Sequence, residues 1–215
     1  MNEEGGYLGA MTYQCLFSAS LERLRKVHGD NPQAINSISN LQMLLHQADR
    51  SSPSFLFDFA KILLADSKLN VNLQESFLRM HATAPIDDLE ISNADNVPEF
   101  QELSTRAIAL RKVLARVPDE MADRRPFLET IKEIASSIKK LLDATNAILQ
   151  IVPQHVQSLI EKRKREFVHY SKRFSNTLKE YFRDQNATQV FISANQLIFQ
   201  ATQIVRAVRE KVVLQ

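Results

Sequence analysis

Residues 127–149 read FLETIKEIASSIKKLLDATNAIL, and this stretch decides the fold. Its apolar side chains recur every three or four residues, which is the spacing of one face of an α-helix. They are Phe127, Leu128, Ile131, Ile134, Ile138, Leu141 and Leu142. The last segment of the chain repeats the pattern with Val190, Phe191, Ala194, Leu197, Ile198, Ala201, Ile204 and Val208. The two stripes predict long amphipathic helices that each bury one face against other helices.

Two further segments around these stripes have the same helical spacing, and the four together predict a four-helix bundle. The predicted helices cover residues 98–116, 119–149, 156–183 and 187–213. Short turns around Pro118 and Gln185 would join neighbouring antiparallel helices. Pro126 falls in the first turns of the second helix. Because proline lacks an N–H donor, we expect it to bend that helix or to move its start to about residue 126.

The first 81 residues predict a separate helical unit, with helices at 12–28, after Pro32, after Pro53 and at 72–81. The third of these helices is apolar almost all round. Its apolar residues are Phe55, Leu56, Phe57, Phe59, Ile62, Leu63 and Leu64. A helix that is apolar on all sides must be buried on all sides, and a unit of this size can hardly bury it alone.

We therefore expect the N-terminal unit to form an obligate dimer with a second copy or a related partner. The residues expected at this interface are Leu16, Phe17, Leu21, Leu24, Ile38, Leu41, Leu45, Phe55, Phe59, Ile62 and Leu63. The alternative is that the third helix packs on the C-terminal unit instead. Residues 82–97 contain Pro85 and several carboxylates and predict a linker, so the predicted domains are 1–81 and 98–215.

The composition argues against a membrane-spanning or secreted protein. The 215-residue sequence has four glycines and no apolar run near the roughly 18 to 20 residues that span a bilayer. Cys15 is the single cysteine, so no internal disulfide can form, and residues 1–10 do not resemble a secretory signal. These features predict a soluble, cytoplasmic protein.

Charge is divided unevenly along the chain. The net charge of +2 combines −5 over residues 1–97, from 7 Lys and Arg against 12 Asp and Glu, with +7 over residues 98–215. The basic half favours acidic peptides, anionic lipids or nucleic acid as partners, and charge alone does not choose among them.

No set of residues predicts catalysis, because no nucleophile or general base has an evident partner. The histidines show no metal-ligand spacing, and we expect them at or near the surface. They are His28, His46, His81, His155 and His169. The glycines of the first nine residues do not follow a strand, which excludes a nucleotide-binding fingerprint. We expect a protein that is not an enzyme and that holds neither a cofactor nor a metal ion.

Four lysines predict a binding groove. Lys132 and Lys139 lie seven residues apart, so they share a face of the second bundle helix. Lys172 and Lys179 do the same on the third. The small residues between the lysines are Ala135, Ser136, Ser175 and Asn176. A shallow groove with cationic rims suits an amphipathic helix that has an apolar ridge and acidic edges.

Other interpretations of the basic residues stay open at this point. The lysines could form a solvated face without a partner. Residues 162–165, KRKR, could contact anionic lipid headgroups or RNA, or could simply be an exposed part of a helix. The C-terminal unit lacks the interleaved aromatic residues of nucleic-acid stacking platforms, so nucleic acid is the least favoured of these partners.

Nearly the whole sequence resembles one family, and the resemblance is densest from Glu99 onward. The motifs that carry it are Glu99-Phe100-Gln101, Val117-Pro118-Asp119-Glu120, Thr130-Ile131-Lys132, Ile134-Ala135-Ser136, Leu141-Leu142-Asp143, Glu166-Phe167-Val168, Tyr170-Ser171-Lys172, Thr177-Leu178-Lys179 and Ser193-Ala194-Asn195. The family is that of programmed cell death protein 10, also called the cerebral cavernous malformation 3 family. The first 70 residues agree with it more in helical pattern than in identity.

The resemblance implies a non-catalytic adaptor with an N-terminal helical dimerisation domain and a C-terminal bundle similar to the focal adhesion targeting domain. Its N-terminal domain would form homodimers and exchange the partner for germinal-centre kinases of subgroup III. Its bundle would bind paxillin-type leucine- and aspartate-rich motifs, the cerebral cavernous malformation 2 protein and striatin.

The resemblance also implies which residues bind and where the protein acts. The groove residues would be Lys132, Ala135, Ser136, Lys139, Ser171, Lys172, Ser175 and Lys179. A phosphoinositide is a further implied ligand of this surface. The implied roles are in kinase signalling, cell survival and the integrity of junctions and vessels. The implied location is the cytoplasm, with peripheral association to the Golgi and the cell membrane.

Overall fold

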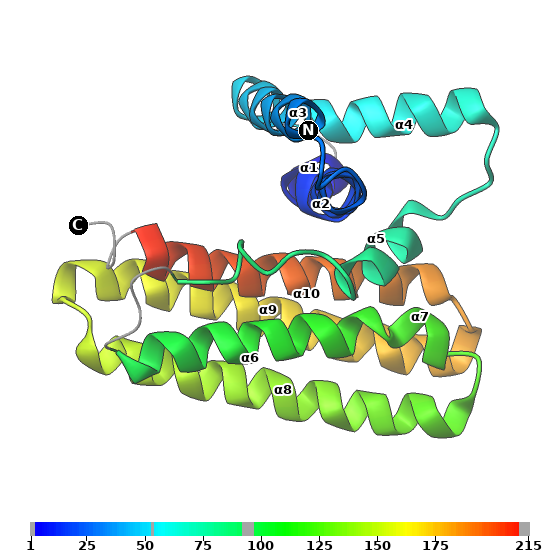
Figure 1. Ribbon diagram of the computed structural model, residues 1–215. Coiled ribbons are helices and arrows are strands. Elements are labelled where there is room, and N and C mark those ends of the chain that lie inside the picture. The colour runs from blue at the N-terminus through cyan, green and yellow to red at the C-terminus, as the bar shows by residue number, and fades with distance from the viewer. Residues whose placement is uncertain (1–2, 53, 92–96, 211–215) are drawn as a thin grey trace. The chain divides into compact units, whose positions relative to one another are not determined.

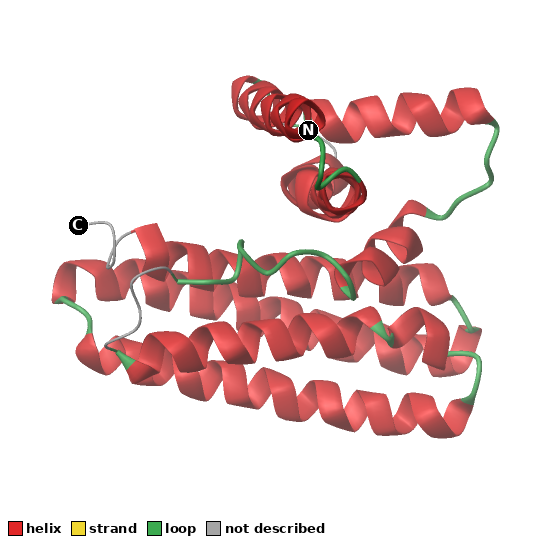
Figure 2. Ribbon diagram, viewed as in Figure 1, coloured by secondary structure: helices red, strands yellow, loops and turns green. Residues whose placement is uncertain are grey.

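The computed structural model describes residues 3–52, 54–91 and 97–210, and within these ranges all regular secondary structure is helical (Figure 2). The predicted all-α fold is therefore confirmed. The chain divides into two compact units, residues 1–85 and 86–215. Each unit has its own set of packed helices.

The first unit begins with a continuous helical segment made of α1 (Glu3–Thr12), the π-helical turn η1 (Tyr13–Ser18) and α2 (Ala19–Val27). It continues with α3 (Pro32–Ser51), α4 (Phe55–Ser67) and the short α5 (Leu73–His81). Helix α1 packs against α4, α2 against α3, and α5 against η1. Phe57 of α4 and Phe77 of α5 meet edge to face in the interior, with ring centroids 6.5 Å apart.

The first helix starts at Glu3, well before the predicted start at residue 12. The prediction was wrong because three glycines near the N-terminus favour a loop over a helix. At Gly9 a close approach explains the glycine, since a Cβ there would lie 3.3 Å from the Cβ of Ser54. The missing side chain lets α1 pass close to the residue that precedes α4.

Side-chain caps begin two helices of the first unit. The Asn31 side chain accepts hydrogen bonds from the backbone N–H groups of Gln33 and Ala34, each at 3.1 Å. Pro32 follows at the first helical position, where its missing N–H costs nothing. Asn72 accepts from the backbone N–H of Glu75 at 3.2 Å. These residues define the starts of α3 and α5.

The second unit contains the long helices α6 (Pro98–Ala115), α8 (Arg124–Ile151), α9 (Gln154–Asp184) and α10 (Ala187–Val208), with the single turn α7 (Val117–Glu120) between α6 and α8. The four long helices lie side by side as a bundle, α6 against α8 and α9 against α10 (Figure 1). Large side chains that are almost fully buried fill its centre: Leu103, Leu110, Leu114, Phe127, Ile134, Phe167 and Phe174. All eight predicted core residues of α10 are buried.

The start of α8 shows how Pro126 is accommodated. The helix begins at Arg124 and is capped by Asp123, whose side chain accepts from the backbone N–H of Arg125 at 2.9 Å. Pro126 is therefore the third helical residue, where no intrahelical donor is needed, and it moves the start of the predicted helix without breaking it. Residues 119–120 belong to α7 instead.

The connection between the units differs from the expected linker at 82–97. The units divide between Pro85 and Ile86, and residues 86–91 belong to the second unit. Leu89 and Ile91 are buried. Two apolar side chains within an otherwise polar segment explain the packing, and the prediction gave them too little weight. Residues 92–96 lie outside the described part of the chain, as do 211–213 of the last predicted helix.

Candidate interaction surfaces

The predicted groove residues lie on two neighbouring helices of the bundle, α8 and α9. Seven of the eight are exposed, and Ser171 is half-buried. Lys132 and Lys139 are on α8, while Lys172 and Lys179 are on α9. The structure thus places all four cationic side chains at the surface of two helices that contact each other.

Aromatic contacts fix how α8 and α9 face each other. The ring of Phe127, in the first turn of α8, lies 5.6 Å from Tyr181 and 5.9 Å from Phe182 near the end of α9. The helices therefore run antiparallel, as Figure 1 shows. Lys132 and Lys179 belong to this end of the pair. The other two lysines lie seven residues further along each helix, or roughly 10 Å at 1.5 Å per residue.

The serines of α9 turn their hydroxyl groups back to their own helix. Ser171 Oγ donates to the carbonyl of Val168 at 2.8 Å, and Ser175 Oγ donates to the carbonyl of Ser171 at 3.0 Å. These hydroxyls are already satisfied by backbone acceptors. A partner helix could therefore cover them without leaving a hydroxyl unpaired, which would otherwise cost binding free energy.

The lysine charges are weakly neutralised. Lys132 Nζ lies 2.8 Å from Glu129 Oε1, but both side chains are mostly exposed, and such a pair contributes ~0.2 to 1 kcal/mol at most. In the part of the chain that the structure describes, no ion pair is formed by Lys139, Lys172 or Lys179. The groove presents net positive charge to a partner.

Two apolar side chains at one end of the groove extend the predicted set. Leu128, predicted to be in the core, is 39% exposed, and Phe182 is 37% exposed. Leu128 lies one turn before Lys132 on the same face, and Phe182 lies one turn after Lys179. The neighbouring pair Phe127-Leu128 contained only a weak signal, because adjacent helical residues point about 100° apart and can still both be buried, as Val190 and Phe191 are.

The second candidate surface is the outer side of α4. Its inner side buries Leu56, Phe57 and Ala60. On the outer side Phe55 and Phe59 are exposed and their rings stack, with centroids 6.2 Å apart and planes at 4°. Ile62 and Leu63 follow, 66% and 51% exposed. A single helix thus offers four large apolar side chains to solvent.

The remaining residues predicted for the dimer interface include exposed, half-buried and buried side chains. Leu24 of α2 and Leu41 of α3 are exposed, whereas Leu21 and Ile38 are buried. Leu16, Phe17 and Leu45 are half-buried. Leu21 and Ile38 therefore pack inside the unit and are not available on its surface. Exposed apolar residues of this unit that the prediction did not include are Val27, Met43, Leu44, Leu69, Val71 and Met80.

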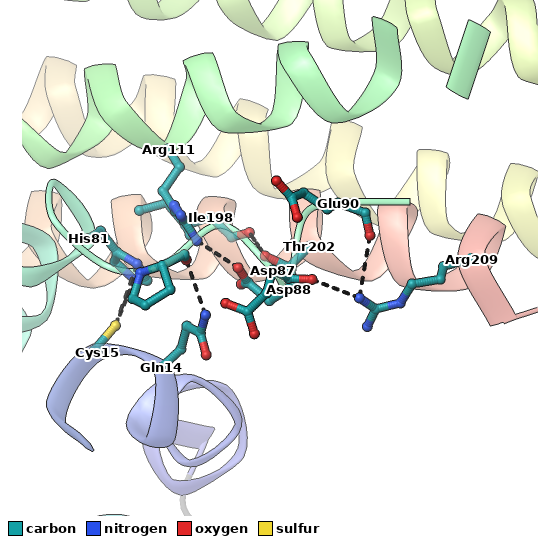
Figure 3. Close-up of polar contacts among 11 residues, drawn as sticks. Gln14, Cys15, His81, Asp87, Asp88, Glu90, Arg111, Ile198, Thr202 and Arg209 are labelled. Atoms are coloured by element: carbon teal, nitrogen blue, oxygen red, sulfur yellow. Dashed lines mark hydrogen bonds and ion pairs between the residues drawn. The ribbon is translucent and has the colours of Figure 1, made fainter. Parts of the chain in front are cut away.

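A buried pair lies at the contact of η1 with α5. Cys15 Sγ is 3.5 Å from His81 Nδ1, and both residues are buried (Figure 3). The expectation that every histidine lies near the surface was therefore wrong for His81, because η1 covers the C-terminal end of α5. Among the described residues, no group of three or more His, Cys, Asp and Glu side chains could hold a metal ion.

Across the described ranges, no helix has both the length and the apolar character needed to cross a bilayer.

Comparison with known proteins identifies relatives of the chain. The family described as "Programmed cell death protein 10, C-terminal" matches residues 71–166, from just before α5 into α9. A Caenorhabditis elegans protein named "Programmed cell death protein 10 homolog" is 62% identical over 211 residues, which is 98% of this chain and 98% of the relative. With such identity over nearly the full length, the chain belongs to the programmed cell death protein 10 family.

Proposed function

We propose that the chain is a non-catalytic adaptor that joins two kinds of helical partner through two separate surfaces. Membership of the programmed cell death protein 10 family supports an adaptor role. The two surfaces differ in chemistry, since one is an apolar helix face and the other a lysine-rimmed groove. Different chemistry would let both partners bind without competing.

The apolar face of the first unit is proposed to bind a second copy of the chain or the related segment of a subgroup III germinal-centre kinase. Phe55, Phe59, Ile62 and Leu63 support this proposal because large apolar residues clustered on one helix favour a protein interface. In the homodimer the face would be covered by its own copy, and exchange would replace that copy by the kinase.

The groove between α8 and α9 is proposed to bind acidic, leucine-rich helices of the paxillin type, including segments of striatin and of the cerebral cavernous malformation 2 protein. The observation that carries this proposal is the antiparallel placement of Lys132 and Lys179 beside exposed Leu128 and Phe182. A partner helix could place its apolar ridge between the helices and its carboxylates against both rims.

Titration of the full chain with a labelled acidic, leucine-rich helical peptide tests the groove. The double variant Lys132→Glu/Lys179→Glu should bind the peptide at least tenfold more weakly, because attraction becomes repulsion at both rims. The matched control is Lys162→Glu/Lys164→Glu, which makes the same charge change in the basic run of α9. Equal binding by the wild type and the groove variant would remove the groove proposal.

Light scattering tests the adaptor role of the first unit. The chain alone should elute as a dimer, and addition of the C-terminal segment of a subgroup III germinal-centre kinase should give a one-to-one complex. A monomer that ignores the kinase segment would contradict this half of the proposal.

A second candidate function is phosphoinositide binding at a membrane surface. The specific observation is the basic run 162–165, in which Lys162 is exposed and the Arg165 side chain is 73% exposed and pairs only loosely with Glu161 at 3.8 Å. Sedimentation with phosphoinositide-containing liposomes separates this function from peptide binding. Binding would support the peripheral association that we propose for this protein at the Golgi and the cell membrane.

A further inference from the structure

Residues 86–91, IDDLEI, form a short segment on the second unit that we call the strap. The carbonyl of Ile86 accepts from the backbone N–H groups of Leu89 at 2.8 Å and Glu90 at 3.0 Å. The strap is therefore a single helix-like turn. Its Leu89 and Ile91 side chains are buried, 1% and 6% exposed.

Two arginines of the bundle hold the strap (Figure 3). Arg111 of α6 donates from Nη1 to Asp88 Oδ1 at 2.9 Å, and its side chain is only 3% exposed. Arg209, which follows α10, donates from Nη1 to the carbonyl of Asp87 at 3.0 Å and approaches that of Glu90 at 3.5 Å. The strap thus spans from α6 to the end of α10.

The strap contacts the bundle in the same ways that a bound peptide would. An acidic side chain meets a buried arginine, a leucine fills an apolar position, and a second arginine binds carbonyl groups at the end of the turn, where cations interact favourably with a helix. We propose that the surface formed by Arg111 and Arg209 between α6 and α10 is a second docking site, for an acidic, leucine-bearing helical segment of a partner. The strap occupies this site in cis.

The ion pair favours release of the strap over a permanent structural role. Burial raises the pKa of Asp88 despite the opposing effect of Arg111, so the carboxylate loses more by leaving water than the arginine returns. A permanent cover would be more stable with apolar residues at both positions, because buried ion pairs often contribute less than well-packed apolar groups. The buried Arg111, in place of an apolar residue, suits a site that accepts acidic segments.

A competing segment would replace the strap at little net cost. It would restore the same pair to Arg111 and the same apolar contact, so no charge would be left buried and unpaired. The strap also contributes only one turn, and a longer helix would add contacts along α6 and α10. Binding in trans would therefore depend on how often the strap opens.

The test uses the full chain and a fluorescent peptide with the sequence of residues 84–91. The variant Asp88→Ala/Leu89→Ala removes the ion pair with Arg111 and the buried leucine and should bind the peptide at least tenfold more tightly than the wild type, because the weakened strap leaves the site open more often. Glu90→Ala is the matched control, since this side chain is exposed. It should bind like the wild type. Hydrogen exchange should show residues 86–91 opened in the double variant alone.

Two further variants, made in the Asp88→Ala/Leu89→Ala chain, locate the peptide. Adding Arg111→Ala should abolish binding, and Arg209→Ala should weaken it at least fivefold. Adding Lys132→Glu/Lys179→Glu should leave it unchanged, which separates this site from the groove between α8 and α9. The proposal would be overturned if the double variant has an open strap but does not bind the peptide. It would also be overturned if only the lysine changes abolish binding. Thermal melting confirms that each variant is folded.

Discussion

The two units differ in how completely they cover their apolar residues. Of the sixteen large apolar side chains that are exposed in the described residues, twelve lie in the first unit and four in the second. The second unit is also the longer of the two. Four long helices packed side by side can enclose each other's apolar faces, whereas the smaller first unit leaves more of its apolar side chains uncovered. The exposed apolar side chains are thus concentrated in the first unit, where we propose that a partner binds.

Truncating the bundle core should have the largest effect. Phe174→Ala removes an almost fully buried ring and should lower the free energy of unfolding by about 3–5 kcal/mol. Because the bundle closes on itself, the loss should not depend on protein concentration. Denaturant unfolding at two concentrations, followed by a probe in the bundle, checks both statements. A loss that shrinks at high concentration would mean that the bundle also depends on association.

Placing charge on the outer side of α4 should weaken self-association, which charge placed on the second unit should not do. Phe59→Asp/Leu63→Asp should weaken self-association by about 100-fold, equal to about 2.7 kcal/mol, because two carboxylates would have to be buried at the interface. Sedimentation or light scattering over a dilution series measures this change. The matched control, Leu128→Asp/Phe182→Asp, alters exposed apolar residues of the other unit and should leave self-association as it was.

Removing the apolar end of the lysine groove should have a smaller effect. Leu128→Ser/Phe182→Ser should reduce affinity for an acidic, leucine-rich peptide about tenfold, since partly exposed contacts contribute less than a central anchor. Isothermal titration compares this variant with wild type. Unchanged affinity would restrict the groove to electrostatic recognition by its lysines.

Helix caps should have the smallest effect and should reveal whether the units unfold together. Asn31→Ala in the first unit and Asp123→Ala in the second each remove a cap and should each cost about 1 kcal/mol. If the units unfold independently, each variant should shift only its own transition in calorimetry. A single transition shifted equally by both would show that the units are thermodynamically coupled.

Regular apolar spacing made the bundle predictable. The stripe of α10 was buried at every predicted position, and the helix also buries residues outside that stripe, among them Ser193, Asn195 and Gln196. At α8 the same reasoning overestimated burial, since Leu128 belongs to the face that carries the lysines. Helical spacing identifies the buried face of a helix only to within about one residue. An error of one residue is enough to assign an exposed side chain to the core.

Features made by tertiary contact were not predictable. The close approach of Gly9 to Ser54 joins residues far apart in the sequence, and the burial of His81 depends on η1. The strap resembled a linker because its acidic residues dominate its composition, while its anchors lie on α6 and beyond α10. The surface position of the four lysines could be predicted because both lysine pairs follow local spacing, although the sequence did not reveal which end carried apolar side chains.

The π-helical turn at Tyr13–Ser18 determines how the deletion of one residue would change the first helical segment. A π turn accommodates one residue more than an α turn, and here it lies between helices that bury Tyr7 and Leu8 on one side and Leu21 on the other. Loss of one codon within this turn could leave an unbroken α-helix. Because the π turn absorbs the extra residue, the side chains before and after it would keep their faces. An in-frame deletion of one residue here would thus disturb the inner face far less than a deletion within an α-helical turn, where the side chains on the two sides would rotate by about 100° relative to each other.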